Sequence, residues 1–389
     1  MSSYNFDIQN DMKNKETWKW DKEGAVCKYP LGVADTDYVP PKEIIEAVVS
    51  KASQGNFAYG VLSEQFNESI VSWYKKRHNS FVNSKWISSS PGLITGIKLF
   101  MDAVTHQGDN IIIQSPVYFN FSLIIERNGR KILENTLLYK NGKYEIDFED
   151  LEKKAADPRT TMMILCNPHN PIAFEWDKED LKKIATICNK HNVFVISDEA
   201  HSDILHKGIV HTPFISLDSQ TANNSATINS PGKAFNINGL YVSYVIIPNE
   251  RIKAAYDIAY ANHHFDFSTI GSTALIAAYT YGEQYVNELN EYIEENVKYL
   301  RKFLAESMPE VKMTKANSTY LMWLDFNAWH MNSDEVDEFF RSAGIALNKG
   351  NIYGKAGDGF MRINIGCTKK ILKEALDSLL LKYQEKFKK

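Results

Sequence analysis

Two acids and a histidine follow one another closely in Ile196-Ser197-Asp198-Glu199-Ala200-His201, at the end of an apolar run. In open α/β sheets, ligands bind at the carboxyl ends of the strands. Asp198, Glu199 and His201 are therefore candidates for acid–base chemistry or ligand binding. The simpler alternative is a strand end whose acids face water.

Lys233 is the next candidate, in Ser230-Pro231-Gly232-Lys233-Ala234-Phe235-Asn236, directly after the strand-like stretch 226–229. A lysine in a partly desolvated cleft has a lowered pKa, which leaves a neutral amine able to form a Schiff base. The alternative is a surface-loop lysine, as most lysines of the chain are expected to be.

Two further loops have the composition of ligand-binding turns. In Asn167-Pro168-His169-Asn170-Pro171, two X-Pro steps stiffen the chain and hold the Asn170 amide in place. The loop 90–96 contains glycine and precedes the apolar stretch 97–104, so a helix start there would offer free N–H groups to a phosphate. Either loop could equally be an ordinary turn or helix start.

The elements that must position these residues appear as short apolar runs. Runs without polar alternation suit strands buried on both faces of a parallel sheet. They lie at 111–113, 162–166, 193–196 and 244–247. With helical spacing between them, as at 181–188, the pattern predicts an open α/β sheet with crossover helices.

The chain changes character after Gly282. A long amphipathic helix is expected first, and shorter strands and helices follow it, at 283–305, 320–324, 333–342, 360–364 and 369–387. This order predicts a separate α+β domain at the C-terminus, with the N-terminal stretch packed on it as an arm.

Composition excludes several classes of protein. The chain has 389 residues and a formal net charge of −4, so we expect two domains and no nucleic-acid partner. No apolar run approaches the ~18 residues that span a membrane, and no signal peptide is expected. Four scattered cysteines indicate neither a zinc site nor a disulfide framework. We expect a soluble, cytoplasmic protein without a metal.

Taken in order, these segments resemble the fold-type I pyridoxal-phosphate (PLP) enzymes, the aminotransferase class I/II superfamily. Within it, the chain is most similar to the cystathionine β-lyase and C–S lyase branch of the MalY/PatB type. The segments with this resemblance are VADTDY at 33–38, FAY at 57–59, DEAH at 198–201, KAFN at 233–236 and GFMRINIGC at 359–367. Aminotransferases typically have tyrosine where His201 stands, which favours a lyase.

The resemblance implies a fold and a division of the chain. The fold class is α/β: a large PLP-transferase domain with a mostly parallel seven-stranded sheet in a three-layer α/β/α sandwich, and a smaller α+β domain. Residues 1–47 would form an N-terminal arm and part of the small domain. Residues 48–285 would form the cofactor-binding domain, and 286–389 the C-terminal domain.

The resemblance also implies roles for the candidates already named. Lys233 would bind pyridoxal 5'-phosphate as a Schiff base and act as the base at the substrate α-carbon. Asp198 would pair with the pyridine nitrogen, and His201 would belong to the same cofactor site. Asn170 would hydrogen-bond the ring hydroxyl, and Tyr118 would stack on the ring as a catalytic and cofactor-binding residue.

The remaining implied roles concern anionic groups. The backbone amides of Ile94 and Thr95, with the Ser230 hydroxyl, would bind the phosphate. Tyr59 would reach the phosphate of the neighbouring subunit, which implies a homodimer. Arg362 would hold the substrate α-carboxylate in a bidentate fork. Tyr118, Tyr59 and His201 could each instead be purely structural.

Three positions depart from the family's pattern. Gly32 stands where the family usually has tryptophan, which suggests an enlarged or reshaped pocket. Ile172-Ala173 replaces the usual Thr/Val-Gly after the Asn-Pro turn. Tyr241 stands where many relatives have a basic residue that binds phosphate.

The implied reaction is α,β-elimination from an amino acid with sulfur on its β-carbon, giving pyruvate, ammonia and a thiol. An aminotransferase on the same scaffold is the main alternative. A non-catalytic PLP-binding regulatory protein is the other.

Overall fold

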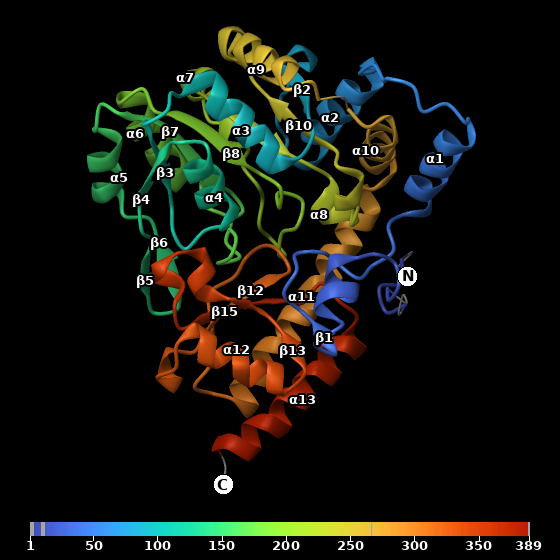
Figure 1. The fold of residues 1–389 in the computed structure, drawn as a ribbon, viewed down its shortest axis with the longest axis vertical. Coiled ribbons are helices and arrows are strands. Elements are labelled where there is room, and N and C mark those ends of the chain that lie inside the picture. Colours follow the sequence, from blue (N-terminus) through green and yellow to red (C-terminus); the bar gives the residue numbers. More distant parts are fainter. Residues whose placement is uncertain (1–3, 9–11, 266, 388–389) are drawn as a thin grey trace.

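A seven-stranded sheet forms the centre of the larger part of this computed structural model (Figure 1), which describes residues 4–8, 12–265 and 267–387. Its strands are, in spatial order, β2 (Ile87–Ser90), β10 (Ser243–Ile246), β9 (Ser225–Asn229), β8 (Phe194–Asp198), β7 (Thr160–Cys166), β3 (Asn110–Ile113) and β4 (Lys131–Glu134). Only β10 runs antiparallel to its neighbours in this sheet. The expected mostly parallel sheet is confirmed.

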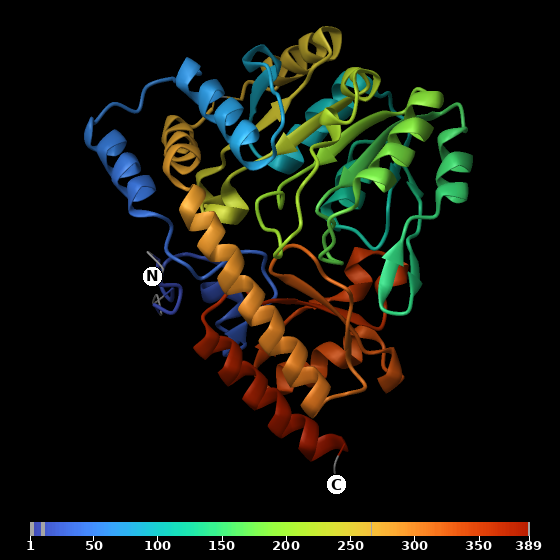
Figure 2. The same ribbon diagram turned by 180° about the vertical axis from the view of Figure 1, so that it is seen from behind.

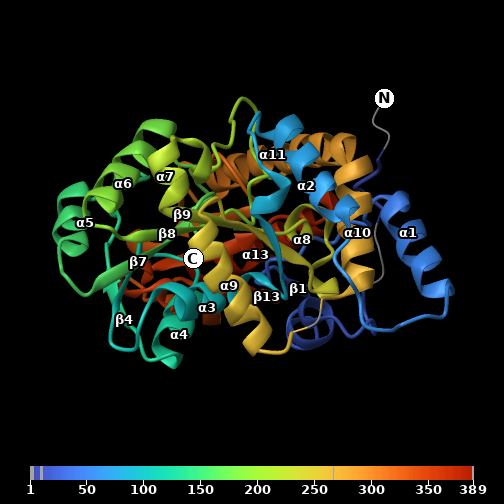
Figure 3. The ribbon, with the colours of Figure 1, turned by 90° about the horizontal axis from the view of Figure 1, so that it is seen from above.

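Helices cover both faces of this sheet, which gives three layers (Figure 3). One face is covered by α3 (Leu93–Val104), α4 (Asn120–Arg127) and α9 (Glu250–Asn262). The other is covered by α5 (Phe148–Ala155), α6 (Lys178–Lys190) and α7 (Ser219–Asn223), with α2 (Glu64–Arg77) and α10 (Thr269–Tyr281) beside β10 and α1 (Lys42–Ser53) outside them.

The strand side chains explain why both faces need a cover. Side chains alternate between the faces of a strand. Met162 and Ile164 of β7 pack in the core beneath α3, whereas Met163 and Leu165 pack in the core beneath α6. With apolar side chains on both sides, the strand is stable only between two helical layers.

The C-terminal part is a second, smaller layer structure. The helix α11 (Glu283–Ser307) leads from the large body into it (Figure 2). Its antiparallel sheet is β11 (Lys312–Met313), β12 (Leu321–Asp325), β15 (Phe360–Asn364) and β14 (Asn348–Lys349), with α12 (Ser333–Ser342) and α13 (Lys369–Phe387). The separate α+β unit is confirmed, and α12, β15 and α13 begin and end where the sequence predicts.

Besides short 3₁₀ and π-helical turns, the described part of the chain has four further strands and one more helix. They are β1 (Tyr29–Pro30), which pairs in parallel with β13 (Ile345–Ala346), the hairpin β5 (Leu138–Lys140) and β6 (Lys143–Glu145), and the one-turn helix α8 (Gly232–Phe235). Through the β1–β13 pair, the N-terminal stretch packs on the small unit. No helix in the described ranges is long and apolar enough to cross a membrane.

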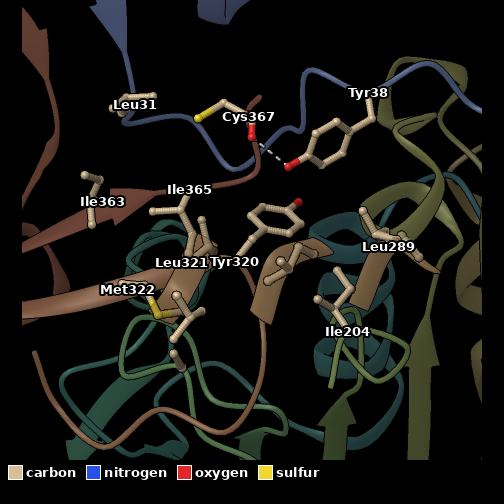
Figure 4. Packing of buried hydrophobic residues seen from close by; sticks show 14 of the residues in the cluster. Leu31, Tyr38, Ile204, Leu289, Tyr320, Leu321, Met322, Ile363, Ile365 and Cys367 are labelled. Carbon is tan, nitrogen blue, oxygen red and sulfur yellow. Dashed lines mark hydrogen bonds between the residues drawn. The ribbon is translucent and has the colours of Figure 1, made fainter. Parts of the chain in front are cut away.

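A buried seam fastens residues 31–38 to the C-terminal unit (Figure 4). The Tyr38 hydroxyl donates a hydrogen bond to the Cys367 carbonyl at 2.9 Å, and Tyr38 is 2% exposed. Asn296 of α11 donates to the same carbonyl, also at 2.9 Å. Leu31 and Ile363 lie in the same apolar cluster, so the seam combines packing with a shared carbonyl.

Tyr38→Phe should lower the free energy of unfolding by about 1 kcal/mol, because one buried hydrogen bond is lost while Asn296 still serves the carbonyl. Urea unfolding measures this. Tyr281→Phe, whose ring is 60% exposed, is the matched control and should change nothing measurable. Equal stability of Tyr38→Phe and wild type would contradict this role of the hydroxyl.

Candidate active site

A cavity of about 780 Å³ lies at the carboxyl ends of β7, β8 and β9. Most of the residues proposed from the sequence line it, although they come from separate loops. They are Ile94, Thr95, Tyr118, Asn170, Asp198, His201, Ser230 and Lys233. The described residues contain no group of three or more side chains arranged to hold a metal.

Lys233 lies on α8 and projects into this cavity, with its side chain one-fifth exposed. Its Nζ donates to the Ala34 carbonyl at 2.8 Å, and the Asp35 carboxylate is 3.8 Å away. Burial lowers the pKa of Lys233, the nearby Arg362 adds to the effect, and Asp35 and Asp198 oppose it. The amine is therefore easier to deprotonate than an ordinary lysine, as Schiff-base chemistry requires.

Asp198 is the last residue of β8 and is 6% exposed. Among the described residues, only the Ala200 amide donates a hydrogen bond to its carboxylate, at 3.1 Å. Burial raises the pKa of Asp198 to about 6, against a smaller opposing effect of Lys233. A buried carboxylate with so few donors favours a cationic partner, and the protonated nitrogen of a pyridine ring is such a group.

The start of α3 suits a phosphate. Gly92 precedes the helix at φ 139°, a conformation that favours glycine, and it provides no side-chain cap. The first amide of α3 that donates a hydrogen bond within the helix is that of Gly96, to the Gly92 carbonyl. The amides of residues 93–95 therefore have no hydrogen-bond acceptor in the described chain. The helix begins four residues earlier than the predicted stretch 97–104 because the glycine allows the sharp entry.

Ser230 is placed differently from its proposed role. Its hydroxyl donates to the Val242 carbonyl at 2.6 Å and accepts from the Gly232 amide at 3.0 Å. In this arrangement the hydroxyl proton faces the protein and not the cavity. A phosphate contact would require the hydroxyl to leave Val242.

Arg362 is held behind the cavity wall and does not line the cavity itself. Its guanidinium donates to Asn170 Oδ1 at 2.9 Å and to the Gly32 carbonyl at 2.7 Å. Its Nε is buried without a hydrogen-bond partner in the described chain. An arginine that is 2% exposed with a free N–H is suited to an anion such as a carboxylate.

Tyr118 and His201 are both neutral components of the wall. Burial raises the pKa of Tyr118, and its hydroxyl accepts from Asn120 at 2.6 Å. Burial, with Lys233 and Arg362 nearby, lowers the pKa of His201 to about 3. The His201 imidazole is therefore uncharged at neutral pH, and its Nδ1 is buried with no partner in the described part of the chain.

The structure shows the surroundings or the conformation of each position that departs from the family pattern. A Cβ at Gly32 would lie 2.9 Å from Asn348 Oδ1 and 3.0 Å from Glu23 Oε2. Two polar side chains therefore fill the space beside Gly32, which favours a reshaped pocket over an enlarged one. Ala173 adopts φ 58°, which explains why glycine suits that position better. Tyr241 lines the cavity and is 72% exposed.

Sequence reasoning missed the contribution of the N-terminal segment. Lys19 donates to the Asp35 carbonyl at 3.0 Å and pairs with the Asp37 carboxylate at 2.9 Å. Trp20 Nε1 donates to Asp37 as well, at 2.8 Å. These contacts hold Ala34 against Lys233. The two closely spaced acids Asp35 and Asp37 could have indicated a site segment, but they suggest no specific partner.

Tyr59 is the candidate that the structure does not bring to the others. It lies between α1 and α2, is 92% exposed and is absent from the lining of the cavity.

With this geometry established, comparison with known proteins identifies the class. The family model for aminotransferase class I and II matches residues 28–379, so the chain belongs to this family. The cystathionine β-lyase PatB of Bacillus subtilis (strain 168) is 39% identical over 96% of this chain and 98% of its own length.

Two solved structures are similar to this chain over nearly its whole length. Cystalysin from Treponema denticola, which contains pyridoxal 5'-phosphate, has a TM-score of 0.95 and 32% identity, over 98% of this chain and 99% of its own. The PLP-bound C–S lyase of Staphylococcus hominis has a TM-score of 0.91 and 28% identity, over 97% and 98%.

Asp198→Asn should stabilise the cofactor-free protein at neutral pH. Because the pKa of Asp198 in the folded chain, about 6, lies above its usual value of 3.8, ionisation opposes folding. The penalty begins above about pH 4 and is complete above about pH 6, where it is on the order of 2–3 kcal/mol. Urea unfolding near pH 8 should therefore favour the variant, and unfolding near pH 4 should not.

With PLP added, the order should reverse, because a neutral amide does not hold a protonated ring nitrogen as a carboxylate does. Equal stability of the two cofactor-free proteins near pH 8 would contradict the view that the buried, ionised Asp198 carboxylate destabilises the folded chain.

Proposed function

We propose that the protein is a PLP-dependent carbon–sulfur β-lyase. It would convert a small amino acid with a sulfur substituent on its β-carbon, of the cystathionine or cysteine-conjugate type, to pyruvate, ammonia and a thiol. The similarity to PatB over nearly the whole chain supports the lyase. The shared cavity of Lys233 and Asp198 supports the cofactor.

The cavity residues offer a matching group to each part of the cofactor. Lys233 would bind the aldehyde, Asp198 would hold a proton at the pyridine nitrogen, and Asn170 would meet the ring hydroxyl. The ring would lie against Tyr118, with His201 in the same wall. Ile94 and Thr95 amides would bind the phosphate, with Ser230 only after its hydroxyl turns from Val242.

When bound, PLP supplies a ring that accepts the electron pair released at the substrate α-carbon. Once the substrate amine has taken its place at the aldehyde, Lys233 would be free as a neutral amine, which its lowered pKa favours, and would remove the α-proton. Arg362, which lies behind the cavity wall, would hold the substrate carboxylate through its unpartnered Nε and so fix which α-carbon bond faces the lysine. Asn170, hydrogen-bonded to Arg362, couples the carboxylate site to the ring site.

Assembly and location are part of the same proposal. The protein would be a cytoplasmic homodimer in which the highly exposed Tyr59 reaches the partner's phosphate site. We also propose the domain limits 1–47, 48–285 and 286–389. The last limit falls in the first turn of α11.

Purified holoenzyme incubated with cystathionine should release pyruvate and ammonia with no keto acid added. Lys233→Ala should lose both this activity and the visible absorbance of lysine-bound PLP. Lys182→Ala, a surface lysine on α6, is the control and should retain both. Pyruvate and ammonia can be followed enzymatically in the same samples.

An aminotransferase would instead require a keto acid and would release no pyruvate from cystathionine alone. That outcome would refute the lyase. PLP binding without turnover of a broad amino-acid panel would favour a regulatory protein.

Mixing two inactive variants tests the shared site. Lys233→Ala and Tyr59→Ala homodimers should each be inactive or severely impaired. After subunit exchange, random pairing restores about a quarter of the sites, because one site of each mixed dimer then has both native residues. Lyase activity after mixing measures this recovery. No recovery, with exchange verified by differently tagged subunits, would mean that Tyr59 does not act across the dimer.

A further inference from the structure

A buried triad of ionisable groups lies behind the active-site wall and takes no part in the proposed chemistry. The His211 ring stands between two glutamates. Its Nδ1 is 2.9 Å from Glu175 Oε1, and its Nε2 is 3.2 Å from Glu199 Oε2, although without hydrogen-bond geometry on that side. The three residues are 1%, 4% and 0% exposed, in the order His211, Glu175, Glu199.

The ring carries a charge at neutral pH. Burial by itself would lower the pKa of His211, but the two glutamates outweigh it and raise the pKa to about 10. On its other side, His211 meets the edge of the His78 ring, with centroids 5.1 Å apart, and burial lowers the pKa of His78. Asp203 and Arg77 lie beyond His78. His211 is therefore the cation between the two glutamates.

Glu175 connects this cation to the turn that bears Asn170. Its Oε1 accepts from Asn167 Nδ2 at 3.0 Å. Asn167 in turn accepts from the Trp176 amide at 3.0 Å, which closes the turn on itself. Because Asn167 begins the turn at the end of β7, its position influences where Asn170 points.

Glu199 connects the same cation to the end of β8. It directly follows Asp198, and its Oε1 accepts from the Phe214 amide at 3.0 Å and from Thr227 at 3.1 Å. Its own amide donates to the Ile228 carbonyl at 2.9 Å, in the neighbouring strand. The carboxylate thus ties Asp198 to β9 and to the loop that contains His211.

We propose that His211 is a positioning residue, which as a buried cation joins the Asn170 turn to the Asp198 strand end through Glu175 and Glu199. It therefore sets the spacing of the two side chains that would meet the ring nitrogen and the ring hydroxyl of the cofactor. This role rests on the proposed PLP function.

The physical reason is that like charges in a dry interior cannot remain close without a counter-ion. Without the imidazolium, the two glutamates would lose the group that lies between them. The contacts at Asn167 and beside Asp198 would then change, although no residue that touches the cofactor has been altered.

The test compares His211→Gln and Glu175→Gln with His78→Gln as the matched control. His78 is the adjacent buried histidine, but it contacts neither glutamate by hydrogen bond in the described structure. The measurements on purified holoenzyme are the PLP dissociation constant, the pH midpoint of the visible absorbance band and the melting temperature. Glu175→Gln keeps the shape of the side chain, so it serves if His211→Gln does not fold.

We expect His211→Gln to bind PLP at least about tenfold more weakly and to move the pH midpoint of the absorbance band upward, because a nearby positive charge is lost. Glu175→Gln should also weaken PLP binding. His78→Gln should leave the PLP dissociation constant within about twofold of wild type and the pH midpoint unchanged, even if it melts earlier.

The proposal is overturned if both triad variants keep wild-type PLP affinity and midpoint, or if His78→Gln shifts them equally. Failure of the wild-type protein itself to develop a visible band with PLP would instead refute the proposed function, so the two failures are distinguishable.

Discussion

The rest of the site depends on the placement of one carboxylate, that of Asp198, in the dry end of β8 with a single backbone donor. An ionised group there is costly, and the raised pKa of Asp198 expresses this cost. The structure leaves the carboxylate facing the cavity that Lys233 enters. In the empty site the ionised carboxylate has no cationic partner, whereas a protonated pyridine ring would provide one. The ring would bind in one orientation, because only its nitrogen carries the proton.

This arrangement uses both parts of the molecule. The sheet of the large part supplies Asp198 and the Asn170 turn, while Arg362 comes from β15 of the small part. The stretch 31–38 lies between them, accepts from Lys233 at Ala34 and from Arg362 at Gly32, and is fastened by Tyr38 to Cys367. Loosening this seam would therefore disturb lysine and arginine together. The buried triad of His211, Glu175 and Glu199 likewise connects the ends of β7 and β8.

The predicted elements agree best with the structure where apolar periodicity is strong. The helix α12 has the predicted bounds because one buried face defines it, and the strand β15 has them because all five of its residues are buried. The start of α3 was placed too late because the predictive pattern begins with its apolar face, whereas the backbone turns already at Gly92. At Gly32 the absence of a side chain suggested a larger pocket. In the folded chain, however, the Glu23 and Asn348 side chains lie beside this position and fill the space.

Local patterns and motifs of consecutive residues were enough to predict the fold class, the family and the residue types at the strand ends. They did not show that Ala34 holds the lysine, that Arg362 lies behind Asn170, or that His211 stands between two glutamates. Each of these contacts joins residues that are far apart along the chain. Only the tertiary structure could decide them, because burial and the proximity of charges arise when separate elements pack together.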